Sequence, residues 1–166
     1  ILRQLGEARV EIQEMSGMER GRVVLGAIPT IAPYFLPPRL ASFVRAHPQI
    51  EVNVVEEITP VLLEHLHKGT IDLALLALPA PGKELVCEEL MREPLYLVVP
   101  ERHRLARKKI VDLSQIENDS FLLLKEGHCF RENTIFACRR ARVQPNVIFE
   151  SGQFDTILAM VSAGTG

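Results

Sequence analysis

Three cysteines, Cys87, Cys129 and Cys138, are the residues of this sequence best suited to chemistry. A cysteine acts as a nucleophile in its thiolate form, and a nearby cation or the positive end of a helix dipole favours that form. Cys129 stands just before a predicted helix, residues 131–142, and Arg131 follows it two residues later. The sequence therefore makes Cys129 a candidate for a reactive, oxidisable thiol.

The cysteines also fit a structural role, because free cysteines in proteins are commonly small buried apolar residues. Cys138 closes the apolar stretch 135–138, and Cys87 falls in a predicted strand, residues 85–90, with no charged motif around it. Neither their number nor their spacing suits a disulfide framework or a zinc site, so no metal and no cofactor is predicted. The residues alone leave both roles open for Cys129 and favour a structural role for Cys138 and for Cys87.

Two threonines are expected next to helix starts, where a small polar molecule can be held by hydroxyls and free N–H groups. Thr59 suits the N-cap of a helix over residues 60–68, with Pro60 at the first helical position. Thr30 falls in a proline-flanked turn after a strand and can cap the next turn. Capping and ligand contact are both open for each threonine.

The elements that must position these residues alternate between strand and helix. Apolar patterns and capping residues predict strands at 22–28, 51–57, 71–78, 85–90, 95–99, 121–124 and 147–150, helices at 2–18, 36–46, 60–68, 131–142 and 154–163, and a helical turn at 112–116. This order predicts an α/β fold with mainly parallel sheets, in which ligands bind at the carboxyl ends of strands. A break near residues 92–94 predicts two lobes with a binding cleft between them.

The composition of the chain indicates which broad classes of protein it suits. The chain has 166 residues, of which 47% are hydrophobic and 24% charged, and a net charge of −2. These values are ordinary for a globular protein, and they lack the basic excess of a nucleic-acid-binding domain. The basic stretch 102–109 is interpreted as a solvated loop. No apolar run reaches the length of a membrane span, and the few cysteines make a reducing cytoplasm the default compartment.

An ordered set of motifs between residues 20 and 166 resembles the effector-binding domain of LysR-type bacterial transcription regulators. The motifs are Gly21-Arg22-Val23-Val24-Leu25-Gly26, Ile28-Pro29-Thr30, Pro33-Tyr34-Phe35-Leu36-Pro37, Phe43 with His47-Pro48 and Ile50-Glu51-Val52, and Gly69-Thr70-Ile71-Asp72-Leu73-Ala74. The resemblance implies two Rossmann-like lobes of the periplasmic-binding-protein type. Residues 1–20 would end a linker helix, 21–92 would form part of lobe I and 93–166 part of lobe II, and we expect the C-terminal part of the domain to lie beyond this chain.

The resemblance also implies a regulator and not an enzyme. In this family an N-terminal winged helix, which this sequence does not contain, binds DNA. The lobes bind a small-molecule effector, and the protein forms a homodimer or homotetramer, with RNA polymerase as a further expected partner and no membrane association. A thiol peroxidase and a periplasmic binding protein are the competing classes, but the sequence shows neither a sign of a reductant-docking surface nor a signal peptide.

A narrower resemblance lies in residues 127–138. Gly127-His128-Cys129-Phe130-Arg131, with Cys138 nine residues after Cys129, is similar to the peroxide-sensing OxyR branch of the family. That similarity implies a peroxidatic Cys129 and a resolving Cys138, and a peroxide or ligand pocket that contains Thr30, Thr59, His128 and Arg131. Glu132-Asn133 departs from the Asp-Gln that the branch more often has. The alternative is a regulator that binds a metabolite between its lobes and uses its cysteines for packing.

The spacing of the two cysteines constrains any switch. Nine residues of α-helix span about 13.5 Å, whereas a disulfide needs Cα atoms about 4.4–6.8 Å apart. If residues 131–142 are helical, a Cys129–Cys138 disulfide requires that helix to remodel, or else no disulfide forms.

Overall fold

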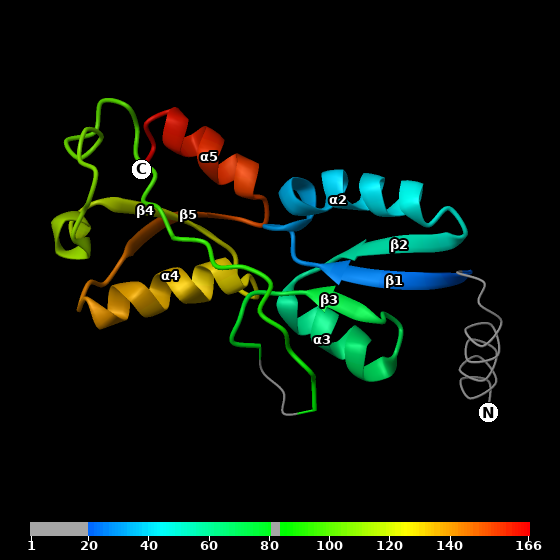
Figure 1. Ribbon diagram of the computed structural model, residues 1–166. Helices are drawn as coiled ribbons and strands as arrows, with labels where there is room; N and C mark the ends of the chain where they lie inside the picture. Colours follow the sequence, from blue (N-terminus) through cyan, green and yellow to red (C-terminus); the bar gives the residue numbers. More distant parts are fainter. Residues whose placement is uncertain (1–19, 81–83) are drawn as a thin grey trace. The chain divides into compact units, whose positions relative to one another are not determined.

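The structure, a computed structural model, describes residues 20–80 and 84–166 (Figure 1). The predicted helix over residues 2–18 lies outside this part of the chain. The chain divides into two compact units, residues 1–75 and residues 76–166. This division falls upstream of the lobe boundary predicted near residues 92–94, and the assignment of residues 76–92 to lobe I stays a prediction.

The first unit is a three-stranded parallel sheet with two helices. Its elements are β1 (Gly21–Ala27), α2 (Ala32–Ala46), β2 (Ile50–Glu56), α3 (Thr59–Lys68) and β3 (Leu73–Leu75). The strands are ordered β2-β1-β3. Figure 1 shows α2 and α3 on opposite faces of the sheet. The predicted α/β fold with parallel strands is confirmed in this unit.

Side-chain alternation along β1 explains why one helix covers each face. Ala27 is fully buried against Ala32 and Leu36 of α2. The preceding residue, Gly26, faces the other way, because a Cβ atom added there would lie 2.7 Å from a side-chain carbon of Leu62 in α3. Successive residues of a strand point to opposite faces. The absence of a side chain at Gly26 thus lets α3 pack closely on the sheet.

Strand β3 is shorter than the predicted strand over residues 71–78. The Asp72 carboxylate accepts a hydrogen bond of 2.7 Å from the backbone N–H of Val24. The Asp72 N–H in turn donates to the Val24 carbonyl at 2.9 Å. A side chain therefore occupies a position in the ladder that a backbone carbonyl would otherwise take, and regular pairing begins one residue later.

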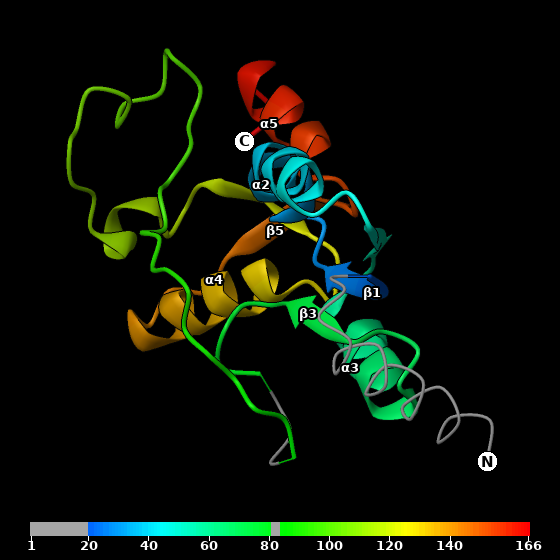
Figure 2. The ribbon, with the colours of Figure 1, turned by 45° about the vertical axis from the view of Figure 1, so that its right-hand side comes forward.

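The second unit contains a short 3-10 helix and a two-stranded parallel sheet. Its elements are η1 (Leu113–Ile116), β4 (Ser120–Leu124), α4 (Cys129–Arg140), β5 (Asn146–Ser151) and α5 (Phe154–Ser162). Helices α4 and α5 lie on opposite sides of the β4–β5 pair, as the two views show (Figures 1 and 2). The largest fully buried side chains of this unit are Ile116, Leu124 and Cys138.

Two predicted strands do not form. Residues 85–90 and 95–99 belong to neither sheet, and most of their apolar side chains are exposed, with Val86 at 102% and Tyr96 at 78% of the reference area. Alternating apolar residues suit a strand, but a strand also needs a backbone partner, and the described strands offer none here. The prediction of a structural Cys87 is wrong for the same reason, because its side chain is exposed.

Candidate functional site

Thr30 and Thr59 lie at the carboxyl edge of the first unit's sheet. Ala27, the last residue of β1, is in register with Glu56, the last residue of β2. Thr30, in the turn before α2, and Thr59, the first residue of α3, each follow that registered pair by three residues. The structure therefore brings both threonines to one edge of the sheet, where open α/β folds place their ligands.

The predicted capping roles of these threonines are wrong. The N-cap of α3 is Ile58, which puts Thr59 inside the first turn, and no side chain caps the helix. The N-cap of α2 is Ile31, again without a side-chain cap. The Thr59 hydroxyl oxygen is buried and has no hydrogen-bond partner among the described residues. A buried hydroxyl without a partner is destabilising by about 1–3 kcal/mol, so this group is suited to bind a polar ligand.

Cys129 begins helix α4 in the second unit. The chain leaves β4 at Leu124 and turns at Gly127, whose φ of 89° suits glycine. His128 is the N-cap, and Cys129 is the first helical residue, two residues earlier than predicted. The Cys129 thiol is half-buried. It lies in the first turn of α4, where backbone N–H groups have no partner within the helix.

His128 is the one buried polar side chain of the described residues, at 7% exposure. Burial disfavours the charged ring and lowers the pKa of His128 below its ordinary value of 6.5. The ring is therefore neutral near pH 7, with one nitrogen that donates and one that accepts a hydrogen bond. A neutral imidazole next to Cys129 in the chain is able to accept a proton but supplies no fixed positive charge.

Arg131 is held by an acidic partner that sequence reasoning missed. Its Nη1 atom donates to the Leu124 carbonyl at 3.1 Å and to the carboxylate of Glu150 in β5. The Arg131 side chain is 15% exposed and that of Glu150 is 41% exposed. Glu150 is in register with Leu123 of β4. The pairing of β4 with β5 could have indicated this contact, because it places Glu150 at the edge where α4 begins.

Cys138 occupies a different environment on the same helix. Its side chain is 1% exposed, and burial raises the pKa of its thiol. Helix α4 is continuous from Cys129 to Arg140, so the two cysteine Cα atoms are about 13.5 Å apart along the helix axis. The structure therefore places both predicted redox residues on one helix but does not bring them together.

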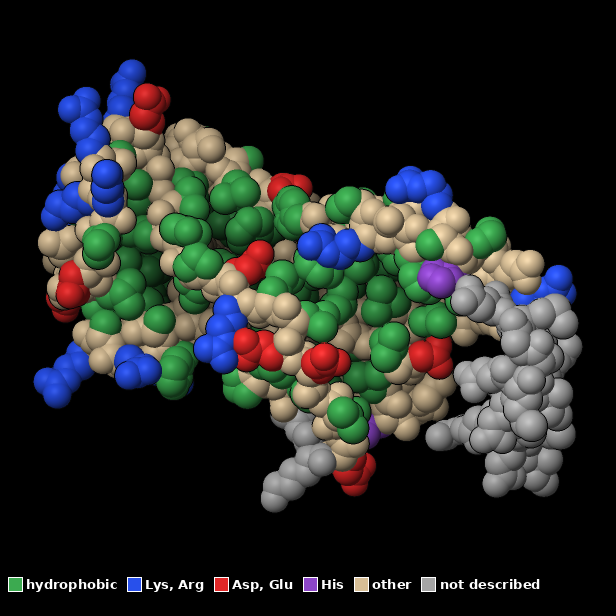
Figure 3. Space-filling model, viewed as in Figure 1, with side chains coloured by type: hydrophobic (Ala, Val, Ile, Leu, Met, Phe, Trp, Pro, Cys, Tyr) green, Lys and Arg blue, Asp and Glu red, His purple; other side chains and the backbone are tan. Residues whose placement is uncertain are grey.

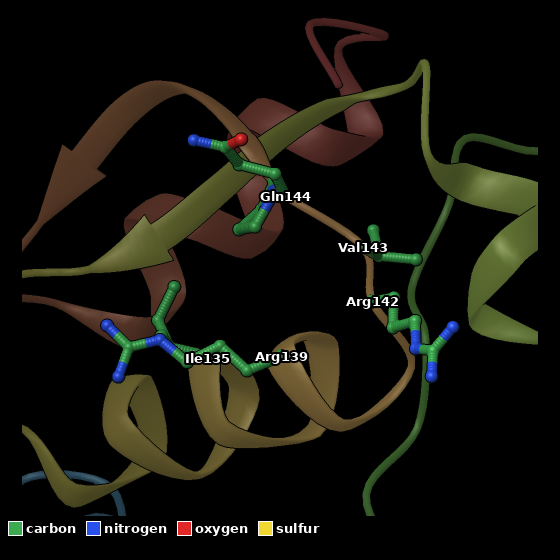
Figure 4. Close-up of a pocket in the computed structure, with 6 residues that line it drawn as sticks. Ile135, Arg139, Arg142, Val143 and Gln144 are labelled. Carbon is green, nitrogen blue, oxygen red and sulfur yellow. The ribbon is translucent and has the colours of Figure 1, made fainter.

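A shallow pocket lies at the opposite end of α4 from Cys129 (Figure 4). It is lined by Ile135, Arg139, Arg142, Val143, Gln144 and Pro145. The guanidinium groups of Arg139 and Arg142 point away from each other in this view. The two cations do not converge on a common point, and the pocket does not form a built anion site.

Neither metal ligands nor a membrane span is found in the part of the chain that the structure describes. Over residues 20–80 and 84–166, no three His, Cys, Asp or Glu side chains cluster as a metal site would require. Within the same ranges, every helix is too short or too polar to cross a bilayer.

Comparison with known proteins places the chain in a family. The LysR substrate binding domain matches residues 16–166. The chain is 34% identical over 148 residues to a probable hydrogen peroxide-inducible genes activator of Mycobacterium leprae, covering 89% of this chain and 48% of that protein. It is 32% identical over 166 residues to the transcriptional dual regulator GltC of Bacillus subtilis, covering 99% of this chain and 55% of that protein. The chain thus spans about half the length of the curated relatives it matches.

Solved structures agree with this result. The C-terminal domain of a probable LysR family regulator from Rhodococcus sp. RHA1 superimposes with a TM-score of 0.82 at 28% identity, covering 89% of this chain and 72% of that one. The reduced OxyR regulatory domain of Pseudomonas aeruginosa gives a TM-score of 0.77 at 33% identity, covering 90% and 71%. These matches confirm the predicted α/β fold of the periplasmic-binding-protein type. The relatives are transcription regulators and not enzymes, and the chain belongs to the LysR substrate-binding domain family.

Proposed function

We propose that this chain is the sensing domain of a bacterial LysR-type transcription regulator that responds to hydrogen peroxide through oxidation of Cys129. The observation that carries the proposal is the position of Cys129 as the first residue of α4, half-buried and preceded by the buried, neutral His128. The similarity to a peroxide-inducible activator and to an OxyR regulatory domain supports it.

The first chemical step is the oxidation of one thiolate by one peroxide. The Cys129 sulfur attacks one oxygen of hydrogen peroxide, so that an S–O bond forms and the O–O bond breaks. The departing hydroxide takes up a proton and leaves as water. Peroxide is reduced by two electrons, and Cys129 becomes a sulfenic acid. The thiolate is the attacking form, so Cys129 loses its thiol proton before the attack.

A second step can convert this oxidation into a change of conformation. The Cys138 thiol attacks the oxidised Cys129 sulfur, the S–S bond forms, the S–O bond breaks, and water leaves. The two cysteines lie on one continuous helix, so α4 must unwind and Cys138 must leave its buried position. A disulfide that requires a helix to remodel is a suitable switch for a regulator.

Candidate ligand-contact residues on each unit complete the proposal. Thr30 and Thr59 lie at one sheet edge, and the Thr59 hydroxyl is buried without a partner among the described residues. Arg131 lies in the first turn of α4 with its charge partly offset by Glu150. We propose that these threonines, together with His128 and Arg131, contact hydrogen peroxide or another small effector.

The second candidate is a regulator that binds a small metabolite and uses its cysteines only for packing. The unpartnered Thr59 hydroxyl and the almost complete burial of Cys138 favour it, because neither needs redox chemistry. The similarity to GltC, whose name refers to no oxidant, is compatible with this alternative. It predicts that a ligand raises the stability of the chain, and that Cys129 reacts with peroxide no faster than the exposed Cys87.

The family supports further proposals about the domains and partners of the whole protein. We propose that residues 1–20 end a linker helix, that residues 21–92 and 93–166 belong to lobes I and II, and that residues 127–138 form the redox segment. A winged helix outside this chain would bind DNA. We further propose a cytoplasmic homodimer or homotetramer that acts on RNA polymerase.

Disulfide mapping tests the proposal. The chain is treated with stoichiometric hydrogen peroxide, blocked and digested, and its peptides are analysed by mass spectrometry for wild type, Cys129→Ser and Cys138→Ser. We expect a Cys129–Cys138 crosslink in wild type only and a sulfenic acid at Cys129 in Cys138→Ser. Equal, slow oxidation of all three cysteines would instead favour the metabolite-binding candidate.

A further inference from the structure

We propose that an ordered basic loop, residues 101–110, contacts the phosphate backbone of duplex DNA. This inference rests on one part of the proposed function, namely that the whole protein binds DNA. The loop carries five cations and the acidic Glu101. The cations are Arg102, Arg104, Arg107, Lys108 and Lys109.

The backbone of the loop is ordered by a buried side chain and by hydrogen-bonded turns. Leu105, at its centre, is 4% exposed and anchors it. Three turns follow one another, each closed by a backbone N–H that donates to the carbonyl three residues earlier. The bonds run from His103 to Pro100 at 2.9 Å, from Ala106 to His103 at 3.0 Å, and from Lys108 to Leu105 at 2.9 Å. Cations on an ordered loop lose less conformational freedom when they bind a partner. The sequence alone predicts a solvated stretch at these residues and does not indicate this order.

One of the five cations fastens the loop to the unit. Arg104 donates to the Asp119 carboxylate and to the Gln115 carbonyl, each at 2.6 Å. The Nε2 atom of His103 lies 3.6 Å from the same carboxylate. Asp119 therefore neutralises Arg104, and the bond to Gln115 fixes the loop against η1. Arg104 is not counted among the contacts to a partner.

The other cations are not neutralised. Arg102, Arg107 and Lys109 are exposed and have no ion-pair partner among the residues that the structure describes. The Lys108 ammonium group donates to the neutral side-chain carbonyl of Gln115, at 3.2 Å, and has no ion-pair partner among the described residues. Figure 3 shows Lys and Arg side chains gathered at the end of the second unit where this loop lies in Figure 1. Four positive charges thus project from one short, ordered segment.

The chemistry of the loop fits a phosphate backbone better than an acidic protein surface. Protein interfaces bury a core of aromatic and apolar side chains, and Ile110 is the only large apolar residue that the loop exposes. Contacts to phosphate need little more than Lys and Arg, and they position a protein without reading the base sequence. The chain's net charge of −2 makes the isolated contact weak. The contact gains strength when another part of the protein already holds the DNA.

Fluorescence anisotropy with a labelled 30-base-pair duplex tests the proposal on this chain, between 50 and 200 mM salt. The loop variant carries Arg102→Gln, Arg107→Gln and Lys109→Gln. The control variant carries Arg139→Gln, Arg140→Gln and Arg142→Gln, which remove the same charge from the end of α4. Three lost phosphate contacts should lower the slope of log K against log salt by about 2.7, at about 0.9 per contact. Circular dichroism confirms that both variants are folded.

We expect the loop variant to bind more weakly than wild type at 50 mM salt, with the lower salt slope, and the control variant to keep most of the wild-type affinity and slope. Equal losses in both variants, or no binding of wild type at 50 mM salt, would overturn the proposal. So would polyglutamate that competes as well as unlabelled duplex at equal charge, because the loop would then prefer an acidic polypeptide. None of these substitutions touches Cys129, so a failure here leaves the peroxide proposal unaffected.

Discussion

The guanidinium group of Arg131 is bound to the carboxylate of Glu150, and this ion pair joins the first turn of α4 to strand β5. The same Nη1 atom also donates to the carbonyl of Leu124 at the end of β4. One cation therefore connects three elements at the point where Cys129 begins its helix. Its positive charge is shared with Glu150 and is only partly available to a thiolate.

Removing the Glu150 charge should lower stability and raise thiol reactivity. We expect Glu150→Gln to lower the free energy of unfolding by about 1 kcal/mol, since the pair is partly exposed to solvent, and the melting temperature by about 2–4 °C. Oxidation of Cys129 by peroxide should become roughly two- to fivefold faster, because Arg131 loses its competing partner. Urea titration and stopped-flow kinetics measure the two effects.

Glu132→Gln is the matched control for that variant. Glu132 lies in the same helical turn but is exposed and has no ion-pair partner in the described residues. Its substitution should cost only a few tenths of a kcal/mol through the helix dipole. If both variants behave alike, the Arg131–Glu150 pair has no special role.

The unpartnered hydroxyl of Thr59 predicts that removing this buried polar group does not lower the stability of the chain. Thr59→Val should leave the chain as stable as wild type or stabilise it by up to about 1 kcal/mol, because it removes a buried polar group without a partner. If the hydroxyl contacts the effector, the same variant should respond less to peroxide or ligand. Urea titration measures the stability, and peroxide oxidation kinetics measure the response.

Thr70→Val is the comparison for Thr59→Val. The Thr70 hydroxyl donates to the His65 carbonyl at 3.1 Å, so its loss should cost about 1 kcal/mol. A Thr59→Val variant that loses as much stability as Thr70→Val would show that the Thr59 hydroxyl has a partner in solution.

Burial of His128 predicts that stability falls on acidification. The pKa of His128 is lowered in the folded chain, so the unfolded chain binds more protons below its ordinary value of 6.5. The free energy of unfolding should therefore fall as the pH drops from 7 through this value, by at most about 1.4 kcal/mol per pH unit for this group. Urea titrations from pH 7.5 to 5 of wild type, His128→Gln and the exposed-site control His67→Gln measure this slope. The account fails here if all three slopes are equal.

Cys138 should tolerate loss of its sulfur better than its replacement by a hydroxyl. Because the side chain is 1% exposed, Cys138→Ser buries an oxygen in an apolar site, and we expect it to be about 1–3 kcal/mol less stable than Cys138→Ala. In the native wild type, burial and the raised pKa of this thiol should also slow its alkylation relative to the exposed Cys87. Thermal melts and timed iodoacetamide labelling provide the measurements.

Local signals account for the parts of the fold that could be predicted. The helix predicted at 60–68 is confirmed as α3, because Pro60 at its start and Gly69 at its end act on their own backbone neighbours. The strands predicted at residues 85–90 and 95–99 do not form. Apolar alternation indicates which side chains suit a strand, whereas strand formation depends on a backbone partner far away in sequence.

The candidate site also contains some residues that a local sequence motif predicts and others that depend on contacts distant in sequence. His128, Cys129 and Arg131 form a contiguous motif, and the structure places all three at the start of one helix. Glu150 has no local signal, since its contact with Arg131 depends on the pairing of β4 with β5. The unpartnered state of the Thr59 hydroxyl likewise depends on packing around it, which no short stretch of sequence specifies.

The relative rate at which peroxide oxidises Cys129 and Cys87 in the same chain tests the central claim most directly. Cys87 is more exposed than Cys129 and serves as an internal reference for an ordinary thiol. Quenched-flow labelling with mass spectrometry should show Cys129 oxidised at least about tenfold faster than Cys87, because the first turn of α4 stabilises negative charge on the attacking sulfur. Oxidation of Cys87 at an equal or higher rate would contradict peroxide sensing by this domain.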